Sequence, residues 1–207
     1  MNAEDRDARW MKLAIELAGK GLGLTSPNPC VGAVIVHKDQ IIGSGFHEKA
    51  GLPHAERNAI ADGIAKGNVG LFPDSTLYVT LEPCSTTGKT PPCTEAIIKH
   101  GFKRVVYGSE DPNPGHKGIA AEILKNAGIK VTRGVLEKEC DFLIRAFRLN
   151  MMEGRSWVIA KSAMSLDGHI SRSPERSQWL TGKAARSFVH TLRSECEAVM
   201  TGGNTVR

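Results

Sequence analysis

The chain has 207 residues, of which 41% are apolar and 24% charged, and its formal net charge is +5. This composition supports a folded core, excludes a largely disordered chain and fits one to two domains. The apolar runs are shorter than the roughly 20 residues of a membrane helix. The acidic start MNAEDRDARW does not fit a signal peptide. We therefore expect a cytoplasmic protein without a membrane partner.

The first 150 residues alternate between helical and strand patterns. Apolar side chains recur on one stripe over residues 8–18, which predicts a helix, and the β-branched run 31–37 predicts the first strand of a hairpin. Further on, the sequence predicts strands over 41–46, 76–81, 104–108 and 129–132 and helices over 54–66, 93–100, 117–127 and 138–150. This order predicts an α/β domain over 1–150, with helices on both faces of a largely parallel sheet.

A second unit is predicted over residues 151–207. Residues 156–164 have the composition of a strand, and 165–170 that of a turn into another strand. Residues 181–196 fit a helix, and 198–203 a strand that ends in glycines. These 57 residues are too few for a complete nucleotide-binding sheet. We therefore expect this unit to be an incomplete part of a longer chain.

The cysteines and one histidine suggest a metal site. The five cysteines are Cys30, Cys84, Cys93, Cys140 and Cys196. An odd number without a secretory signal indicates a reducing compartment, where paired cysteines more often bind metals than form disulfides. His54, Cys84 and Cys93 lie at or just before predicted helix starts, and one His with two Cys is a three-ligand set for catalytic zinc. Glu56, two residues after His54, is placed to move protons beside the metal without binding it.

These motifs resemble those of a known enzyme family. HAE (54–56) and EPC (82–84) resemble the zinc-binding signature of the cytidine deaminase superfamily, although eight residues rather than two separate the cysteines. The long form EPCSTTGKTPPC, together with SPNPCVGAVIV, AGLPHAE and DPNP in the same order, resembles the bifunctional deaminase/reductases of riboflavin biosynthesis. The resemblance covers about residues 8–150 and implies a three-layer α/β/α fold like that of cytidine deaminase.

The resemblance also implies a reaction and a substrate. The substrate would be 2,5-diamino-6-ribosylamino-4(3H)-pyrimidinone 5′-phosphate, whose 2-amino group is replaced by oxygen with release of ammonia. Zinc would activate the attacking water, and Glu56 would carry its protons to the ring nitrogen and the leaving ammonia. The implied substrate-binding residues are Asn28, His47, Lys89, Asp111 and Asn113.

Several of these residues also have structural interpretations. Asn28 between two prolines suits a turn, and His47 could be an ordinary surface histidine. For Asp111 and Asn113, which are common turn residues, the two readings are about even. Many family members carry a histidine where this chain has Thr86.

The second unit resembles the start of the reductase half of the same enzymes. SLDGHI, SQWLTG and MTGGNTV carry this resemblance, which implies a dihydrofolate-reductase-like α/β fold that uses NADPH. Position by position, the implied cofactor-binding residues are Ala163, Trp179 and Thr205, and the implied substrate-binding residues are Ser177 and Arg193.

Two other functions remain open on the residues alone. A tRNA adenosine deaminase-like enzyme would fit the zinc site and the positive charge, but it would favour the two-residue cysteine spacer and a basic, aromatic tail. A non-catalytic zinc-stabilised binding module would not need Glu56. The preferred prediction is an enzyme with a phosphorylated pyrimidine as partner and no nucleic acid. Homo-oligomer formation is left open.

Overall fold

The computed structural model describes residues 2–86, 91–171 and 179–203, and the chain divides into two compact units, Met1–Ser156 and Trp157–Arg207. The first unit holds five strands, β1 (Gly32–His37), β2 (Gln40–Phe46), β3 (Thr76–Leu81), β4 (Arg104–Ser109) and β5 (Lys130–Arg133). Its helices are α1 (Ala3–Gly19), α2 (Ala55–Ala65), the 3-10 helix η1 (Val69–Asp74), α3 (Cys93–Lys99), α4 (Ile119–Asn126), α5 (Glu137–Leu143) and α6 (Arg145–Glu153).

The five strands form one mixed sheet in the order β2-β1-β3-β4-β5. β1 runs antiparallel to both of its neighbours, β2 and β3, whereas the β3–β4 and β4–β5 pairs are parallel. The expected parallel character therefore holds only for the half of the sheet where α3 and α4 connect successive strands. The other half begins with a hairpin, which joins antiparallel strands.

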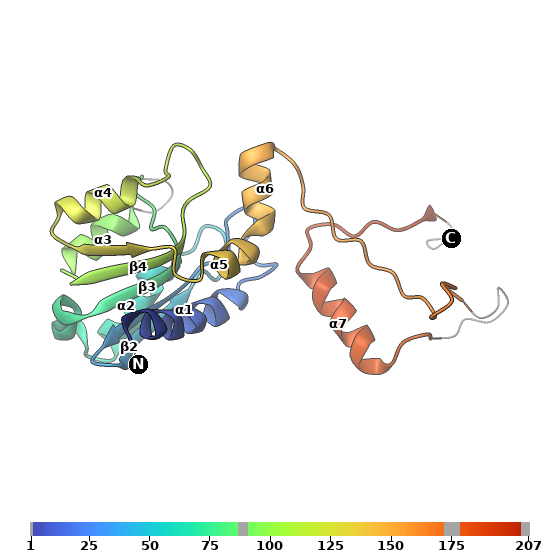
Figure 1. Cartoon of the computed structure of the whole chain (residues 1–207), viewed down its shortest axis with the longest axis horizontal. Helices are drawn as coiled ribbons and strands as arrows, with labels where there is room; N and C mark the ends of the chain where they lie inside the picture. Colours follow the sequence, from blue (N-terminus) through green and yellow to red (C-terminus); the bar gives the residue numbers. More distant parts are fainter. Residues whose placement is uncertain (1, 87–90, 172–178, 204–207) are drawn as a thin grey trace. The chain divides into compact units, whose positions relative to one another are not determined.

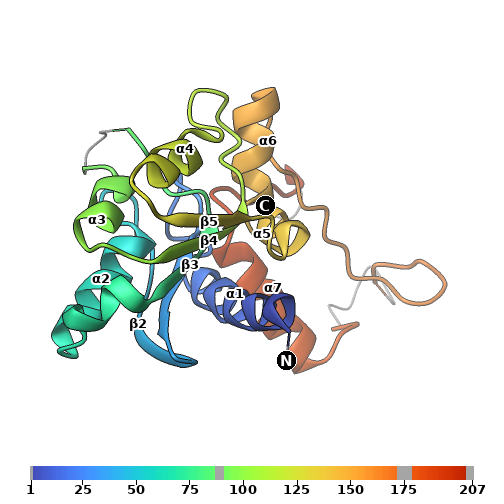
Figure 2. The same ribbon diagram turned by 60° about the vertical axis from the view of Figure 1, so that its left-hand side comes forward.

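Helices cover both faces of this sheet, as the α/β/α prediction requires (Figures 1 and 2). Alternate residues of β1 point to opposite faces, as in any strand. Ala33 and Ile35 belong to the buried cluster that includes α2, α3 and α4, and Val34 and Val36 to the cluster that includes α1 and α5. The sheet is therefore buried on both sides.

Glycines in β2 bring α2 close to the sheet. A Cβ at Gly45 would lie 2.6 Å from the backbone nitrogen of Ala59 in α2, and one at Gly43 would collide with the carbonyl oxygen of the same residue. A side chain at either position would push the helix away. The close approach matters because the first turn of α2 carries His54 and Glu56.

The predicted helix 138–150 is two helices. α5 ends at Leu143 and α6 begins at Arg145, with Ile144 between them at φ −101° and ψ 17°. Ile144 is buried in a cluster with Cys30 and Leu81. The prediction of one helix is therefore wrong, because a continuous amphipathic pattern does not show that the chain bends where one of its residues is buried.

In the second unit, the predicted helix is confirmed as α7 (Lys183–Ser194). The predicted turn is also present, closed by hydrogen bonds from the Ser165 amide to the His169 carbonyl (2.9 Å) and from the Gly168 amide to the Ser165 carbonyl (3.0 Å). The strands predicted over 156–164, after the turn and over 198–203 are not formed among the described residues of this unit. A strand exists only where a neighbour pairs with its backbone.

None of the helices in the described ranges has both the length and the apolar character that crossing a membrane requires.

Candidate metal centre and active site

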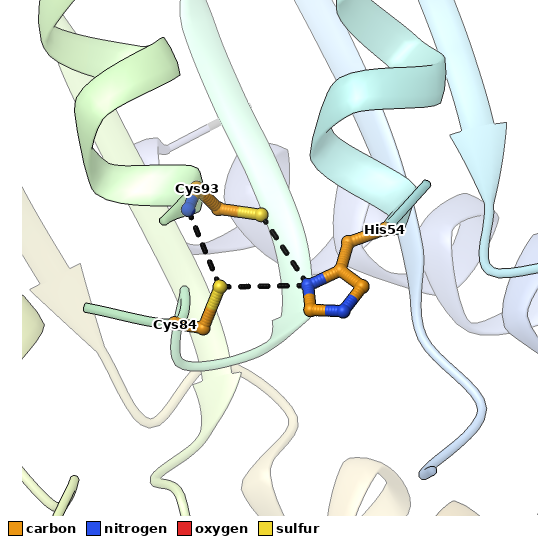
Figure 3. A group of neighbouring side chains, drawn as sticks. All are labelled: His54, Cys84 and Cys93. Atoms are coloured by element: carbon orange, nitrogen blue, oxygen red, sulfur yellow. Dashed lines mark hydrogen bonds between the residues drawn. The ribbon is translucent and has the colours of Figure 1, made fainter. Parts of the chain in front are cut away.

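Three segments bring the expected metal ligands together at the end of β3. His54 is the N-cap residue of α2, Cys93 is the first residue of α3, and Cys84 follows β3 by three residues. The Nδ1 atom of His54 lies 3.4 Å from Sγ of Cys84 and 3.5 Å from Sγ of Cys93 (Figure 3). The ligand atoms of the three side chains all lie within 4.8 Å of one another.

This spacing fits a zinc ion. With Zn–N near 2.0–2.1 Å and Zn–S near 2.3 Å, a tetrahedral site places nitrogen and sulfur ligands about 3.5 Å apart. The two measured N–S distances, 3.4 and 3.5 Å, match that value. One His and two Cys also form a donor set that suits zinc and leaves a fourth position open. The residues present therefore fit the metal that the sequence motifs predict.

The two thiols have different electrostatic environments. A hydrogen bond from the Cys93 thiol outweighs the effect of burial and lowers the pKa of Cys84 to about 4, and His54 and the Cys93 backbone N–H lower it further. This backbone N–H, at the start of α3, donates to Cys84 Sγ over 3.2 Å. The shared hydrogen bond and burial raise the pKa of Cys93. Of the two thiols, Cys84 is therefore the one that ionises more readily.

Glu56 lies in the first turn of α2 with only 3% of its surface exposed. Burial raises the pKa of its carboxyl to about 7, and the negative charge of Cys84 acts in the same direction. It is not one of the residues that group as metal ligands in the described part of the chain. A carboxyl group in this position, with a pKa close to neutrality, is suited to general acid–base chemistry.

His47 and Asn28 lie beside the metal centre. The His47 ring packs edge-on against the His54 ring, with centroids 5.3 Å apart. Burial lowers the pKa of His47, which favours the neutral ring. Its Nδ1–H donates to the Pro53 carbonyl (3.1 Å), so its Nε2 accepts from Nδ2 of Asn28 (3.1 Å). His47 is therefore buried and not an ordinary surface histidine.

Asp111 and Asn113 lie on the loop between β4 and α4, and both make turn-forming hydrogen bonds. Asp111 Oδ1 accepts from the Asn113 amide (2.9 Å), and Asn113 Oδ1 accepts from the Gly115 amide (3.0 Å). Burial raises the pKa of Asp111, and the charge of Cys84 adds to this rise. The Asp111 amide also donates to Glu82, two residues before Cys84, which ties this loop to the segment that carries the metal ligand.

Of the other predicted substrate and cofactor residues, three lie outside the described residues and three are exposed or partly exposed. Lys89, Ser177 and Thr205 lie outside the described residues. Trp179 is 79% exposed, and the Arg186 guanidinium lies 4.6 Å from the centre of its ring. Arg193 is exposed and Ala163 partly exposed.

Sequence reasoning missed two residues that organise the site. The guanidinium of Arg57, in the first turn of α2, donates to the carbonyls of Pro91 (2.9 Å) and Pro92 (3.1 Å). It thereby ties the helix of His54 to the segment just before Cys93. Glu82, the first residue of the EPC motif, is buried and accepts hydrogen bonds from three backbone amides. The only sign of this role in the sequence was the position of Glu82 two residues before Cys84.

The comparisons with known proteins agree with this geometry. Residues 4–109, just over half of the chain, match the family model of the cytidine and deoxycytidylate deaminase zinc-binding region. The chain therefore belongs to this family of zinc-binding deaminases. Residues 156–207 match the RibD C-terminal domain.

Particular relatives are riboflavin biosynthesis proteins. The chain is 48% identical over 203 residues to the riboflavin biosynthesis protein RibD of Synechocystis, which covers 97% of this chain and 53% of that protein. A Thermotoga maritima diaminohydroxyphosphoribosylaminopyrimidine deaminase/5-amino-6-(5-phosphoribosylamino)uracil reductase has a TM-score of 0.86 and 47% identity, over 93% of this chain and 54% of that one. Acinetobacter baumannii RibD has a TM-score of 0.87 and 45% identity, over 99% of this chain and 56% of that one.

The resemblance inferred from the motifs is thus confirmed. The chain spans about half the length of the curated relatives that it matches.

Proposed function

We propose that this chain deaminates 2,5-diamino-6-ribosylamino-4(3H)-pyrimidinone 5′-phosphate to 5-amino-6-ribosylaminouracil 5′-phosphate and ammonia, a step of riboflavin biosynthesis. The observation that carries the proposal is the His54, Cys84 and Cys93 donor set with the buried carboxyl of Glu56 beside it. The names of the relatives, RibD and the deaminase/reductase of Thermotoga maritima, support the same substrate class.

In this proposal the three ligands hold zinc, which supplies the Lewis acidity that activates water at neutral pH. Glu56 accepts a proton from the attacking water and passes it to the ring nitrogen. It then takes the second proton from the hydroxyl group now on the ring carbon and delivers it to the amino group, so that the C–N bond breaks, the C=O bond forms and ammonia leaves. The burial of Glu56 keeps bulk water away from these transfers.

The substrate is held by residues around the metal centre. Because Asn28 donates through Nδ2 to His47, its Oδ1 is the atom that we assign to an N–H group of the pyrimidine. His47 lines the pocket. Asp111 and Asn113 are assigned to the ribose, and Lys89 to the phosphate. Asp111 is supported by its electrostatic interaction with Cys84, and Lys89 rests on the sequence resemblance alone.

The second unit is proposed to be the first part of a reductase. In a longer parent chain this domain would reduce the ribosyl group to ribityl with NADPH, as the RibD C-terminal match over 156–207 suggests. Ala163, Trp179 and Thr205 would then face the cofactor, and Ser177 and Arg193 the substrate. A cytoplasmic location completes the proposal.

An ammonia-release assay with the diaminopyrimidine phosphate tests the proposed activity. We expect turnover that stops on zinc chelation and returns when zinc is added back. A tRNA stem-loop assayed in parallel tests the adenosine deaminase alternative. Deamination of the tRNA but not of the pyrimidine phosphate would contradict the proposal, and so would a zinc-loaded protein that deaminates neither.

A further inference from the structure

One buried carboxylate next to the metal centre has no role in the chemistry proposed above. Glu82 directly follows β3, two residues before Cys84, and is only 4% exposed. Its Oε2 accepts from the amides of Gly118 (3.0 Å) and Asp111 (3.3 Å), and its Oε1 accepts from the amide of Ala120 (3.2 Å). All three donors come from the loop between β4 and α4 or from the first turn of α4.

These bonds close the loop 110–118 at both of its ends. The Asp111 amide is at the start of the loop, and the Gly118 and Ala120 amides are where it enters α4. Gly118 has φ +77°, a conformation that favours glycine, so the chain turns sharply there. Amides at a helix start have no partner within the helix, and a negative charge is stabilised beside them. Hydrogen bonds to a buried carboxylate are among the stronger ones in proteins.

We propose that Glu82 is a positioning residue that holds the loop 110–118 beside the metal centre and thereby places Asp111 and Asn113 for substrate binding. The effect on substrate rests on the function proposed above, whereas the effect on the loop does not. Glu82 and Cys84 belong to the same short segment after β3. One backbone segment therefore supplies a metal ligand and also anchors the loop that carries Asp111 and Asn113.

The loop can be tested without any substrate. In the unsubstituted protein we expect slow hydrogen exchange at the Gly118 and Ala120 amides, which donate to the buried Glu82 carboxylate, compared with the Gly115 amide, which bonds to a partly exposed side chain of its own loop. Glu82→Gln replaces one acceptor oxygen by an NH2 group that faces backbone donors. Exchange at Gly118 or Ala120 should then accelerate by about tenfold or more.

Kinetics and metal content locate the effect. Because Glu82 acts through the substrate loop, Glu82→Gln should raise KM for the diaminopyrimidine phosphate about tenfold and change kcat by less than about threefold. The zinc content should stay at the level of the unsubstituted protein. Glu122→Gln is the matched control, since it makes the same change on an exposed residue of α4. It should alter neither exchange nor KM.

Three results would overturn the positioning role. These are fast exchange of Gly118 and Ala120 in the unsubstituted protein, a Glu82→Gln protein with unchanged exchange and KM, or a loss of zinc and kcat with unchanged exchange. The first measurement needs no variant, so it decides the matter even if Glu82→Gln does not fold. If the unsubstituted protein deaminates no pyrimidine phosphate, the proposed function fails, and the exchange data alone decide the role of Glu82 in the loop.

Discussion

The two thiols of the metal centre differ in position as well as in environment. Cys84 lies in an extended segment after β3 and is partly exposed, whereas Cys93 begins α3 and is buried. Both face Nδ1 of His54 from distances that a zinc ion would bridge. Each thiolate would therefore supply one zinc ligand, and the loss of either should weaken zinc binding.

Cys93→Ser is expected to reduce bound zinc from one ion per chain to well below one. A serine hydroxyl is a poor zinc ligand because it is not deprotonated at neutral pH, whereas zinc strongly prefers thiolate and imidazole. Metal analysis of the purified protein measures the effect. Cys196→Ser is the control, because Cys196 is exposed and belongs to the second unit. Full zinc occupancy in the Cys93→Ser protein would remove this residue from the ligand set.

Glu56→Gln is expected to lower kcat by about 10²–10⁴-fold, the usual range for loss of a general acid–base group. The amide keeps the size of the side chain but cannot carry a proton. Zinc should remain bound, since Glu56 is not one of the three side chains that converge as metal ligands in the described part of the chain. Turnover is measured by ammonia release, with Glu95→Gln in the first turn of α3 as the exposed control. A Glu56→Gln enzyme with near-normal kcat would contradict the proton-carrying role.

At the scale of elements, a buried ion pair far from the metal centre ties α1 to the sheet. Both oxygens of Asp7 accept hydrogen bonds from the Arg104 guanidinium of β4, at 2.9 and 2.6 Å. The Tyr78 hydroxyl of β3 donates to the same carboxylate over 2.8 Å. Only 8% of the Asp7 side chain is exposed, against 27% of that of Arg104. Removing the carboxylate charge would leave the guanidinium half-buried without its counter-ion.

Asp7→Asn is therefore expected to lower the free energy of unfolding by about 2 kcal/mol, within the range for hydrogen bonds to charged groups and below that for fully buried pairs. Denaturant unfolding measures this change. Glu16→Gln, an exposed carboxylate-to-amide change on the same helix, should stay within about 0.5 kcal/mol. Zinc content should be unchanged in both variants. A loss of zinc in Asp7→Asn would show that the pair supports the metal centre as well as the packing of α1.

An element could be predicted from the sequence where the residues that define it lie close together in the chain. The strands at 76–81 and 104–108 and the helix starting at Cys93 were predicted because their residue patterns are complete within a few positions. The order of strands in the sheet was not predicted, because pairing depends on contacts between distant segments. For the same reason the run 156–164 was wrongly predicted as a strand, since its pattern carries no information about a pairing neighbour.

The same distinction applies to the site. The His54, Cys84 and Cys93 set could be proposed because its spacing is a motif, and the structure brings these three side chains together. Arg57 and Glu82 were missed. Arg57 donates to residues 34 and 35 positions away, and Glu82 accepts from one 38 positions away, and no local pattern marks such partners.

At the scale of the whole chain, the two units differ in what they bury. The three buried apolar clusters found among the described residues, with the side chains packed against them, lie before residue 148 and thus within Met1–Ser156. In the second unit the described residues include one helix of twelve residues, α7, and no paired strands. None of the residues of α7 is buried. The buried clusters of the first unit are therefore made of its own residues.

The two proposed activities are accordingly expected to separate in this chain. A variant that ends at Ser156 should keep one zinc ion and the ammonia-release rate of the 207-residue protein, because it retains every buried cluster and every residue of the metal centre.

NADPH titrated into the 207-residue protein should show no saturable binding in the low micromolar range. A nucleotide site needs walls from several strands, and the described residues of the second unit supply none. Fluorescence or calorimetry measures the binding, with the Ser156 variant as the control that lacks the second unit. Saturable NADPH binding by the 207-residue protein but not by the control would show that residues 157–207 form a cofactor site without a completed sheet. Loss of zinc or turnover on truncation would instead show that the second unit supports the deaminase.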